Sequence, residues 1–166
     1  MDINLVEKQF RHYFKPYELV SYAHYQKING DEEAIYKLFT HRIKASMVYL
    51  RESFCAPFLI NNWHNYIDQL KYKSIAELEK ELGIDIYEFR GFRAEDCKIG
   101  AKYSQHKKGN AFDVTIRGFE AEKARLLIRD RFMKDLPYPI RLEMDVKWVH
   151  IDSENLTKYK LQFFKV

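Results

Sequence analysis

The sequence predicts an α+β fold in which a helical N-terminal part packs on a small antiparallel sheet. Apolar residues recur at intervals of three and four through the first third of the chain, which indicates amphipathic helices. Alternation of apolar and polar residues is clearest near the C-terminal end, and one further helical stretch lies between the alternating segments. Helices that precede strands in this way are typical of α+β proteins.

Two helices are predicted first. One runs from Pro16 to about Ile28, because Pro suits a first helical turn and Asn29-Gly30 favours a helix end. Asp31 can cap the second, which extends to about Phe54. The apolar residues of this second helix form one stripe, which we assign to the core: Ile35, Leu38, Phe39, Ile43, Met47, Leu50 and Phe54.

Shorter elements are predicted in the middle of the chain. Residues Phe58–Trp63 have the pattern of a strand. Ser74 with Glu77 forms a capping box, so a short helix begins there and ends at Gly83. Alternation over Ile84–Phe89 predicts a second strand.

The C-terminal half supplies the rest of the predicted sheet. Pro137 and Pro139 separate its helix from its last strands. The predicted elements are a loop over 91–110, a strand over Asp113–Arg117, a helix from Phe119 to about Leu136, and a hairpin of strands Ile140–Asp145 and Lys147–Asp152.

Length and composition bound the class of protein. With 166 residues the chain is long enough for one domain with a real core, and we expect residues 1–166 to form a single domain. The 12 Tyr and 12 Phe argue against disorder. The 28 basic residues are scattered among 24 acidic ones for a formal net charge of +4, so no nucleic-acid partner is expected.

No segment of the sequence has the pattern of a membrane or export signal. No apolar run approaches the roughly 20 residues that span a bilayer, and Met1–Lys15 lacks the apolar core of a signal peptide. We therefore expect a cytoplasmic protein as synthesised. In that reducing compartment Cys55 and Cys97 are expected to be free thiols. The oligomeric state is left open.

Two motifs contain residue types that bind metals. The first runs from Ser104 to Asp113 (SQHKKGNAFD) and the second from Trp148 to Asp152 (WVHID). Together they supply two histidines and a carboxylate, His106, Asp113 and His150. Neutral imidazole with carboxylate is a ligand set that zinc accepts in catalytic sites, where a fourth position stays open for water.

The spacing within these motifs suits a metal site on a sheet. Gly109 permits a tight turn after His106. Asp113 lies between two apolar strand residues, so it points off the apolar face. The second motif alternates in the same way, which places His150 and Asp152 on one face.

These residues also carry a family resemblance. The pattern Ser-x-His-x-x-Gly-x-Ala-x-Asp followed by Trp-Val-His-x-Asp resembles the zinc D-alanyl-D-alanine carboxypeptidases and L-alanyl-D-glutamate peptidases of peptidase family M15. That fold is shared with the hedgehog signalling domain and some phage endolysins. Gly91-Phe92-Arg93 matches the Gly-Tyr/Phe-Arg element before the first ligand, and the segments Leu50–Phe54 and Asn61–Trp63 match more loosely.

The resemblance implies a zinc cofactor and a role for each residue. His106, Asp113 and His150 would be the zinc ligands, and Arg93 would act in catalysis and bind a substrate carboxylate or carbonyl. Ser104 and Gln105 would lie at the substrate rim. Asp152 would accept a hydrogen bond from a ligand and so orient it.

The general base is left open between two residues. Relatives place a Glu three residues before the last ligand or a His five residues before it, and this sequence has Lys147 and Asp145 at those positions. Glu143 lies two residues earlier, and on one strand it would share a face with Asp145. Spacing favours Asp145 and residue type favours Glu143.

The predicted function is hydrolysis of peptidoglycan stem peptides by a zinc metallopeptidase. The bond would be of the D-Ala-D-Ala or L-Ala-D-Glu type, cut by a carboxypeptidase or an endopeptidase, and the enzyme would be phage-encoded and released to the cell wall. The alternative is a catalytically inactive zinc-binding module, or a phage structural or interaction module, of the same fold. Lys102, Lys107 and Lys108 either attract an anionic substrate or serve solubility.

Overall fold

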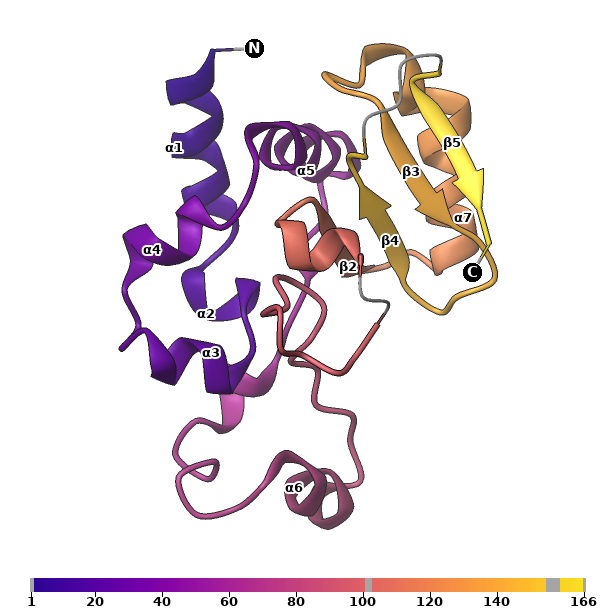
Figure 1. The fold of residues 1–166 in the computed structure, drawn as a ribbon. Helices are drawn as coiled ribbons and strands as arrows, with labels where there is room; N and C mark the ends of the chain where they lie inside the picture. Colours follow the sequence, from indigo (N-terminus) through magenta and orange to yellow (C-terminus); the bar gives the residue numbers. More distant parts are fainter. Residues whose placement is uncertain (1, 101–102, 155–158, 166) are drawn as a thin grey trace.

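Helices form the N-terminal part of the chain, and a five-stranded sheet lies in the C-terminal part (Figure 1). The computed structural model describes residues 2–100, 103–154 and 159–165. The helices are α1 (Ile3–Tyr13), α2 (Pro16–Leu19), α3 (Tyr22–Lys27), α4 (Glu32–Lys37), α5 (His41–Phe54), α6 (Ile75–Leu82) and α7 (Ala121–Leu127). The strands are β1 (Phe58–Leu59), β2 (Ala111–Ile116), β3 (Ile140–Glu143), β4 (Val149–Asp152) and β5 (Leu161–Phe164). The predicted α+β class is confirmed.

Short helical turns complete the secondary structure. A π-helical turn and a 3-10 turn continue α7, and two further 3-10 turns precede α6 and β2. Their bounds are Ile128–Phe132, Met133–Asp135, Trp63–Tyr66 and Gln105–Lys108. None of the helices in the described part of the chain has the length and apolar character needed to cross a membrane.

The sheet has the strand order β1-β2-β4-β3-β5 and is mixed. Its first three pairings are antiparallel, but β5 runs parallel to β3. The predicted antiparallel arrangement therefore holds for β1, β2, β4 and β3, and the parallel strand β5 was not predicted. Residues 161–164, which the alternation pattern did not single out, add a strand along the outer edge of β3.

Each of the two predicted N-terminal helices is divided into two, the first into α2 and α3 and the second into α4 and α5. The first is interrupted at Val20 and Ser21, where the Ser21 side chain accepts a hydrogen bond from the His24 N–H and starts α3. The second is interrupted between α4 and α5, where the Thr40 N–H donates to the Gly109 carbonyl at 3.1 Å. The predicted cap is confirmed, because the Asp31 side chain accepts from the Ala34 N–H.

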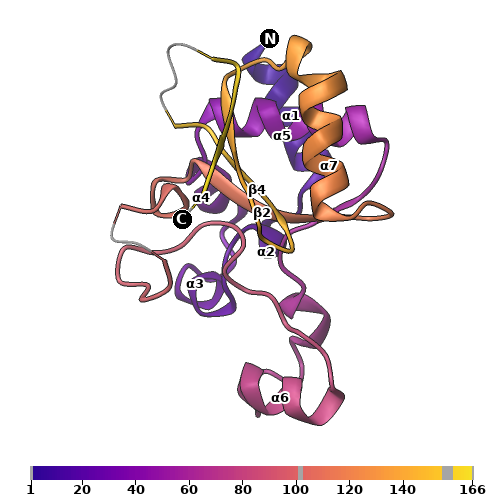
Figure 2. The same ribbon diagram turned by 90° about the vertical axis from the view of Figure 1, so that its right-hand side faces the viewer.

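The segment around α6 projects away from the sheet (Figure 2). Ser74 and Glu77 form the predicted capping box, and Gly83 ends the helix in the left-handed region at φ 65°. A small apolar cluster of Trp63, Leu70, Leu78 and Ile86 supports this projection.

Two predicted strands in this region are wrong or shortened. The segment 84–89 forms no strand, because a side chain takes the place of a neighbouring strand: the Tyr87 N–H donates to the Asn62 side-chain oxygen. Directly after the segment, the Arg90 N–H donates to Asn61 in the same way. Backbone groups satisfied in this way need no ladder partner. Of the strand predicted over 58–63, only the first two residues pair, with β2.

The main core lies between the N-terminal helices and one face of the sheet. Phe112 of β2 stacks on Phe39, with ring centres 4.7 Å apart, and Phe10 of α1 lies 6.1 Å from it. Figure 2 shows α5 and α7 on this side of the strands and the loop that precedes β2 on the other. That loop contacts β2 at Asp113, whose N–H donates to the Arg90 carbonyl at 2.7 Å.

Candidate metal centre

The pairing of β2 with β4 brings Asp113 and His150 together. Asp113 and His150 are directly opposite each other in the antiparallel register, so their side chains share one face. The Nδ1 atom of His150 lies 2.6 Å from Oδ1 of Asp113. Both side chains are buried, with residue exposures of 4% and 9%.

His106 approaches from the 3-10 turn that precedes β2. The Ser104 side chain accepts from the His106 N–H at 3.3 Å, and Gly109 ends the turn at φ +64°. A Cβ on Gly109 would lie 1.7 Å from the Leu38 carbonyl oxygen, so only glycine fits. The predicted turn is confirmed, and it places Nε2 of His106 3.4 Å from Oδ2 of Asp113.

Each histidine has one ring nitrogen held by the protein and the other directed at Asp113. Nδ1 of His106 lies 2.7 Å from the Gly91 carbonyl oxygen, and Nε2 of His150 lies 3.2 Å from Oδ2 of Asp152. A histidine that binds a metal through one ring nitrogen almost always donates the N–H of the other to a carboxylate, a backbone carbonyl or water.

The three facing atoms are close enough to share one metal ion. One ligand atom from each of His106, Asp113 and His150 lies within 4.8 Å of the others. Ligands of a tetrahedral zinc stand about 3.4 Å apart, so only a small approach is required. The donor types, the burial and the held ring nitrogens all fit a divalent metal.

Asp113 and His150 form an ion pair although burial opposes the charge on each of them. Burial raises the pKa of Asp113, but the two histidines outweigh it and hold that pKa well below its usual range. Burial lowers the pKa of His150, but hydrogen bonds to Asp113 and Asp152 outweigh it and raise the pKa to about 9. A metal cation would therefore replace a proton on His150.

Asp152 is itself held by an arginine. Nε and Nη2 of Arg141 donate to the two carboxylate oxygens at 2.9 and 3.0 Å, because Arg141 lies opposite Asp152 in the β3–β4 register. Arg141 also pairs with Glu154. Sequence reasoning missed Arg141. Arg141 lies two residues before Glu143 and so shares its face of the strand, which could have indicated a role in the site. The residue opposite Arg141 depends on the length of the hairpin turn, which the sequence pattern does not define.

The Gly91-Phe92-Arg93 element supports the other two ligands. A Cβ on Gly91 would lie 2.0 Å from the Leu19 carbonyl oxygen, and this close packing directs the Gly91 carbonyl at His106. Arg93 donates through Nη2 to Asp113 at 3.0 Å and through Nε to the Phe89 carbonyl at 2.7 Å. In this structure Arg93 thus orients Asp113.

The ligand group opens on a cavity of about 400 Å³. Except for Asp145, every site residue predicted from the sequence lines it: Arg93, Ser104, Gln105, His106, Asp113, Glu143, His150 and Asp152.

The two candidate bases lie in different places. Glu143 is the last residue of β3 and lines the cavity, and within the described residues its carboxylate forms no hydrogen bond or ion pair. Asp145 lies on the turn after the strand, at φ 64°, and pairs with Lys165 at 2.6 Å. The expectation that both residues project from one strand face is wrong, because the strand ends at Glu143.

The buried group of His106, Asp113 and His150 opens on a cavity that the Glu143 carboxylate also lines. This arrangement is suited to metal-dependent hydrolysis. A family model described as Peptidase M15 matches residues 45–152, more than half of the chain. The chain therefore belongs to the peptidase M15 family, a family of metal-dependent peptidases. No curated protein and no solved structure matches it.

Proposed function

We propose that the protein is a zinc-dependent peptidase that cuts D-Ala-D-Ala or L-Ala-D-Glu type bonds in peptidoglycan stem peptides. The observation that carries the proposal is the convergence of His106, Asp113 and His150 beside the Glu143 carboxylate in one cavity. As part of the same proposal, the protein reaches this substrate by release from the producing cell, as a phage-encoded enzyme would.

The residues around the cavity divide the work of hydrolysis. Bound at His106, Asp113 and His150, zinc would supply Lewis-acid polarisation and make water more acidic. Glu143 accepts a proton from the attacking water and returns it to the leaving nitrogen. Arg93, already bonded to Asp113, has further N–H groups with which to hold a substrate carboxylate or carbonyl.

Metal content is the first test. Purified protein exposed to zinc and then desalted should retain about one zinc per chain, and His150→Ala should retain none, because only two ligands remain. Hydrolysis of synthetic stem peptides, followed by mass spectrometry, should be lost in the same variant and in the presence of a chelator. Hydrolysis that survived in His150→Ala would remove the zinc mechanism.

A matched pair of carboxylate variants tests the base. Glu143→Gln should keep zinc and lose a factor of about 10²–10⁴ in kcat, since it removes proton transfer alone. Asp145→Asn is the control, because that side chain is exposed and outside the cavity. Zinc binding without any hydrolysis by the unaltered protein would assign the chain to the alternative, a non-catalytic zinc-binding module.

A further inference from the structure

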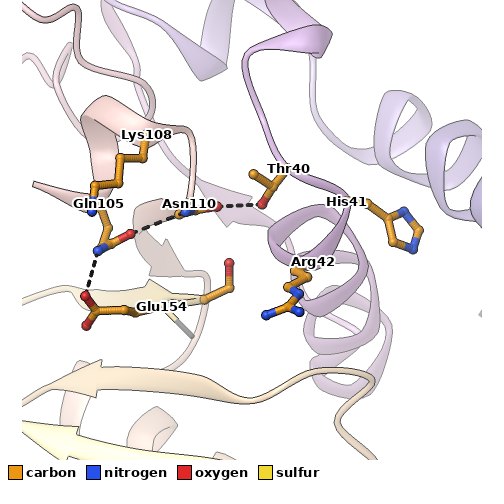
Figure 3. A pocket seen from close by; sticks show the side chains of 8 residues that line it. Thr40, His41, Arg42, Gln105, Lys108, Asn110 and Glu154 are labelled. Atoms are coloured by element: carbon orange, nitrogen blue, oxygen red, sulfur yellow. Dashed lines mark hydrogen bonds between the residues drawn. The ribbon is translucent and has the colours of Figure 1, made fainter. Parts of the chain in front are cut away.

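A second hollow, of about 500 Å³, adjoins the metal centre (Figure 3). Gln105 and Glu154 line both the hollow and the metal-site cavity, so the two spaces share a wall. The remaining walls come from the start of α5, the turn before β2 and the residue after β4. A peptide that extends from the metal centre across this shared wall would enter the hollow.

The N-terminus of α5 forms one side of the hollow. Thr40, the N-cap of this 14-residue helix, provides no capping hydrogen bond, and its hydroxyl donates to the Asn110 side-chain oxygen at 2.6 Å. The first turn contains no acidic residue. The positive end of the helix dipole therefore remains uncompensated by its own side chains.

One buried hydroxyl among the lining residues has no hydrogen-bond partner in the described part of the chain. Ser153 lines the hollow and is 4% exposed, and within the described residues its Oγ forms no hydrogen bond. A buried hydroxyl without a partner is unfavourable by about 1–3 kcal/mol. An acceptor atom from a ligand in the hollow would satisfy it.

The charged side chains of the hollow favour an anion. Arg42 and Lys108 lie on opposite sides of it, while His41 points away (Figure 3). Among the described residues that line the hollow, Glu154 alone carries a carboxylate, and its charge is compensated because it pairs with Arg141 and accepts from Gln105 at 3.1 Å. Two cations, a helix N-terminus and an unsatisfied hydroxyl thus face one space.

We propose that this hollow binds a carboxylate of the peptide substrate, on an acidic residue beyond the bond that is cut. A carboxylate can accept from the Arg42 fork, the Ser153 hydroxyl and the first backbone amides of α5. The inference rests on the proposed function, since the substrate is taken to be a peptide that starts at the metal centre. It assigns an acidic residue of that substrate to a binding site beside the metal centre.

The test compares two uncleavable peptides that differ only in one group, an acidic side chain or its amide. Their binding to zinc-loaded protein is measured by calorimetry for the unaltered chain, for the Arg42→Gln/Lys108→Gln double variant and for Lys123→Gln. Lys123 is an exposed residue of α7 outside the hollow and serves as the matched control. Melting temperatures check that all three proteins are folded.

The unaltered protein should bind the acidic peptide at least tenfold more tightly than the amide. The double variant should reduce this ratio to about one without weakening amide binding, and the control should keep it. Equal affinities in the unaltered protein, a ratio that survives in the double variant, or no binding of the acidic peptide would overturn the inference. Tighter binding of inorganic phosphate than of the acidic peptide would also overturn it.

These readouts separate the two proposals. Binding of uncleavable peptides needs no hydrolysis, so an acid preference without turnover supports the hollow and contradicts the peptidase. Turnover of stem peptides without a preference for the acidic peptide supports the peptidase and contradicts the proposed role of the hollow.

Discussion

Phe112, Asp113 and Val114 of β2 are all buried, but the two faces of the strand are built in opposite ways. On one face Phe112 and Val114 are fully buried among aromatic rings of the N-terminal helices. On the other, Asp113 is nearly as buried, yet it contacts His106, His150 and Arg93 through charged or polar atoms.

This contrast separates stability from chemistry within a single strand. The apolar face gains free energy from every buried carbon and depends little on the identity of its partner. The polar face must compensate the burial of charge with matched partners, so its net contribution to stability is small. Mutations on the apolar face of β2 should therefore change the free energy of unfolding, whereas mutations on the polar face should change the metal affinity.

Phe112→Ala should have the largest effect. Loss of the ring leaves a cavity against Phe39 and Phe10, and we expect the free energy of unfolding to fall by about 3–5 kcal/mol. Urea denaturation of the metal-free protein measures it. A loss below about 1 kcal/mol would show that the apolar face is not the stabilising one.

Asp152→Asn should act on the other face. Metal affinity should fall by about 10–100-fold, because the carboxylate that orients His150 loses its charge. Competition with a chromophoric chelator gives the affinity, and Asp145→Asn is the exposed control. An unchanged metal affinity would mean that the Arg141–Asp152 pair only joins β3 to β4 and does not orient His150.

Stability and metal affinity should depend on pH in opposite directions. Because the pKa of His150 is raised to about 9, its stabilising pair with Asp113 is complete below the ordinary pKa of 6.5 and is lost as the pH rises to about 9. Metal binding displaces that proton, so affinity should rise about tenfold per pH unit over the same interval.

Chelator competition and urea denaturation between pH 6.5 and 9 check both trends. A flat affinity profile would show that His150 loses no proton when the metal binds.

Ser74→Ala should have the smallest effect and touch neither face. It removes half of the α6 capping box, and we expect a loss of about 1 kcal/mol in unfolding free energy with unchanged metal affinity. A drop in metal affinity would connect the α6 projection to the site.

Local signals in the sequence predicted local features well. The Ser74–Glu77 box, the Asp31 cap and the turn at Gly109 each depend on residues within a few positions of one another, and all are present. The same holds for the two strands that carry Asp113 and His150, where alternation alone defines the polar face.

Features that depend on distant residues were not predictable in the same way. The break before Thr40 exists because Gly109 and Asn110, about seventy positions later, dock there. The segment 84–89 has the alternation of a strand, but the Asn62 side chain binds its backbone at Tyr87, and Asn61 binds the next residue, Arg90. Periodicity describes which side is apolar and does not identify the partner of the polar side.

The two histidines differ in how they are held, and this has a genetic consequence. His106 is oriented by the Gly91 carbonyl, a backbone group that every substitution at that position would retain, although the contact with Leu19 forbids a side chain there. His150 depends on the Asp152 side chain, which a single codon change can remove. In a random library, substitutions at residue 152 should therefore lower metal retention at normal protein abundance, as changes in the three ligands would, whereas changes at residue 91 should reduce abundance itself.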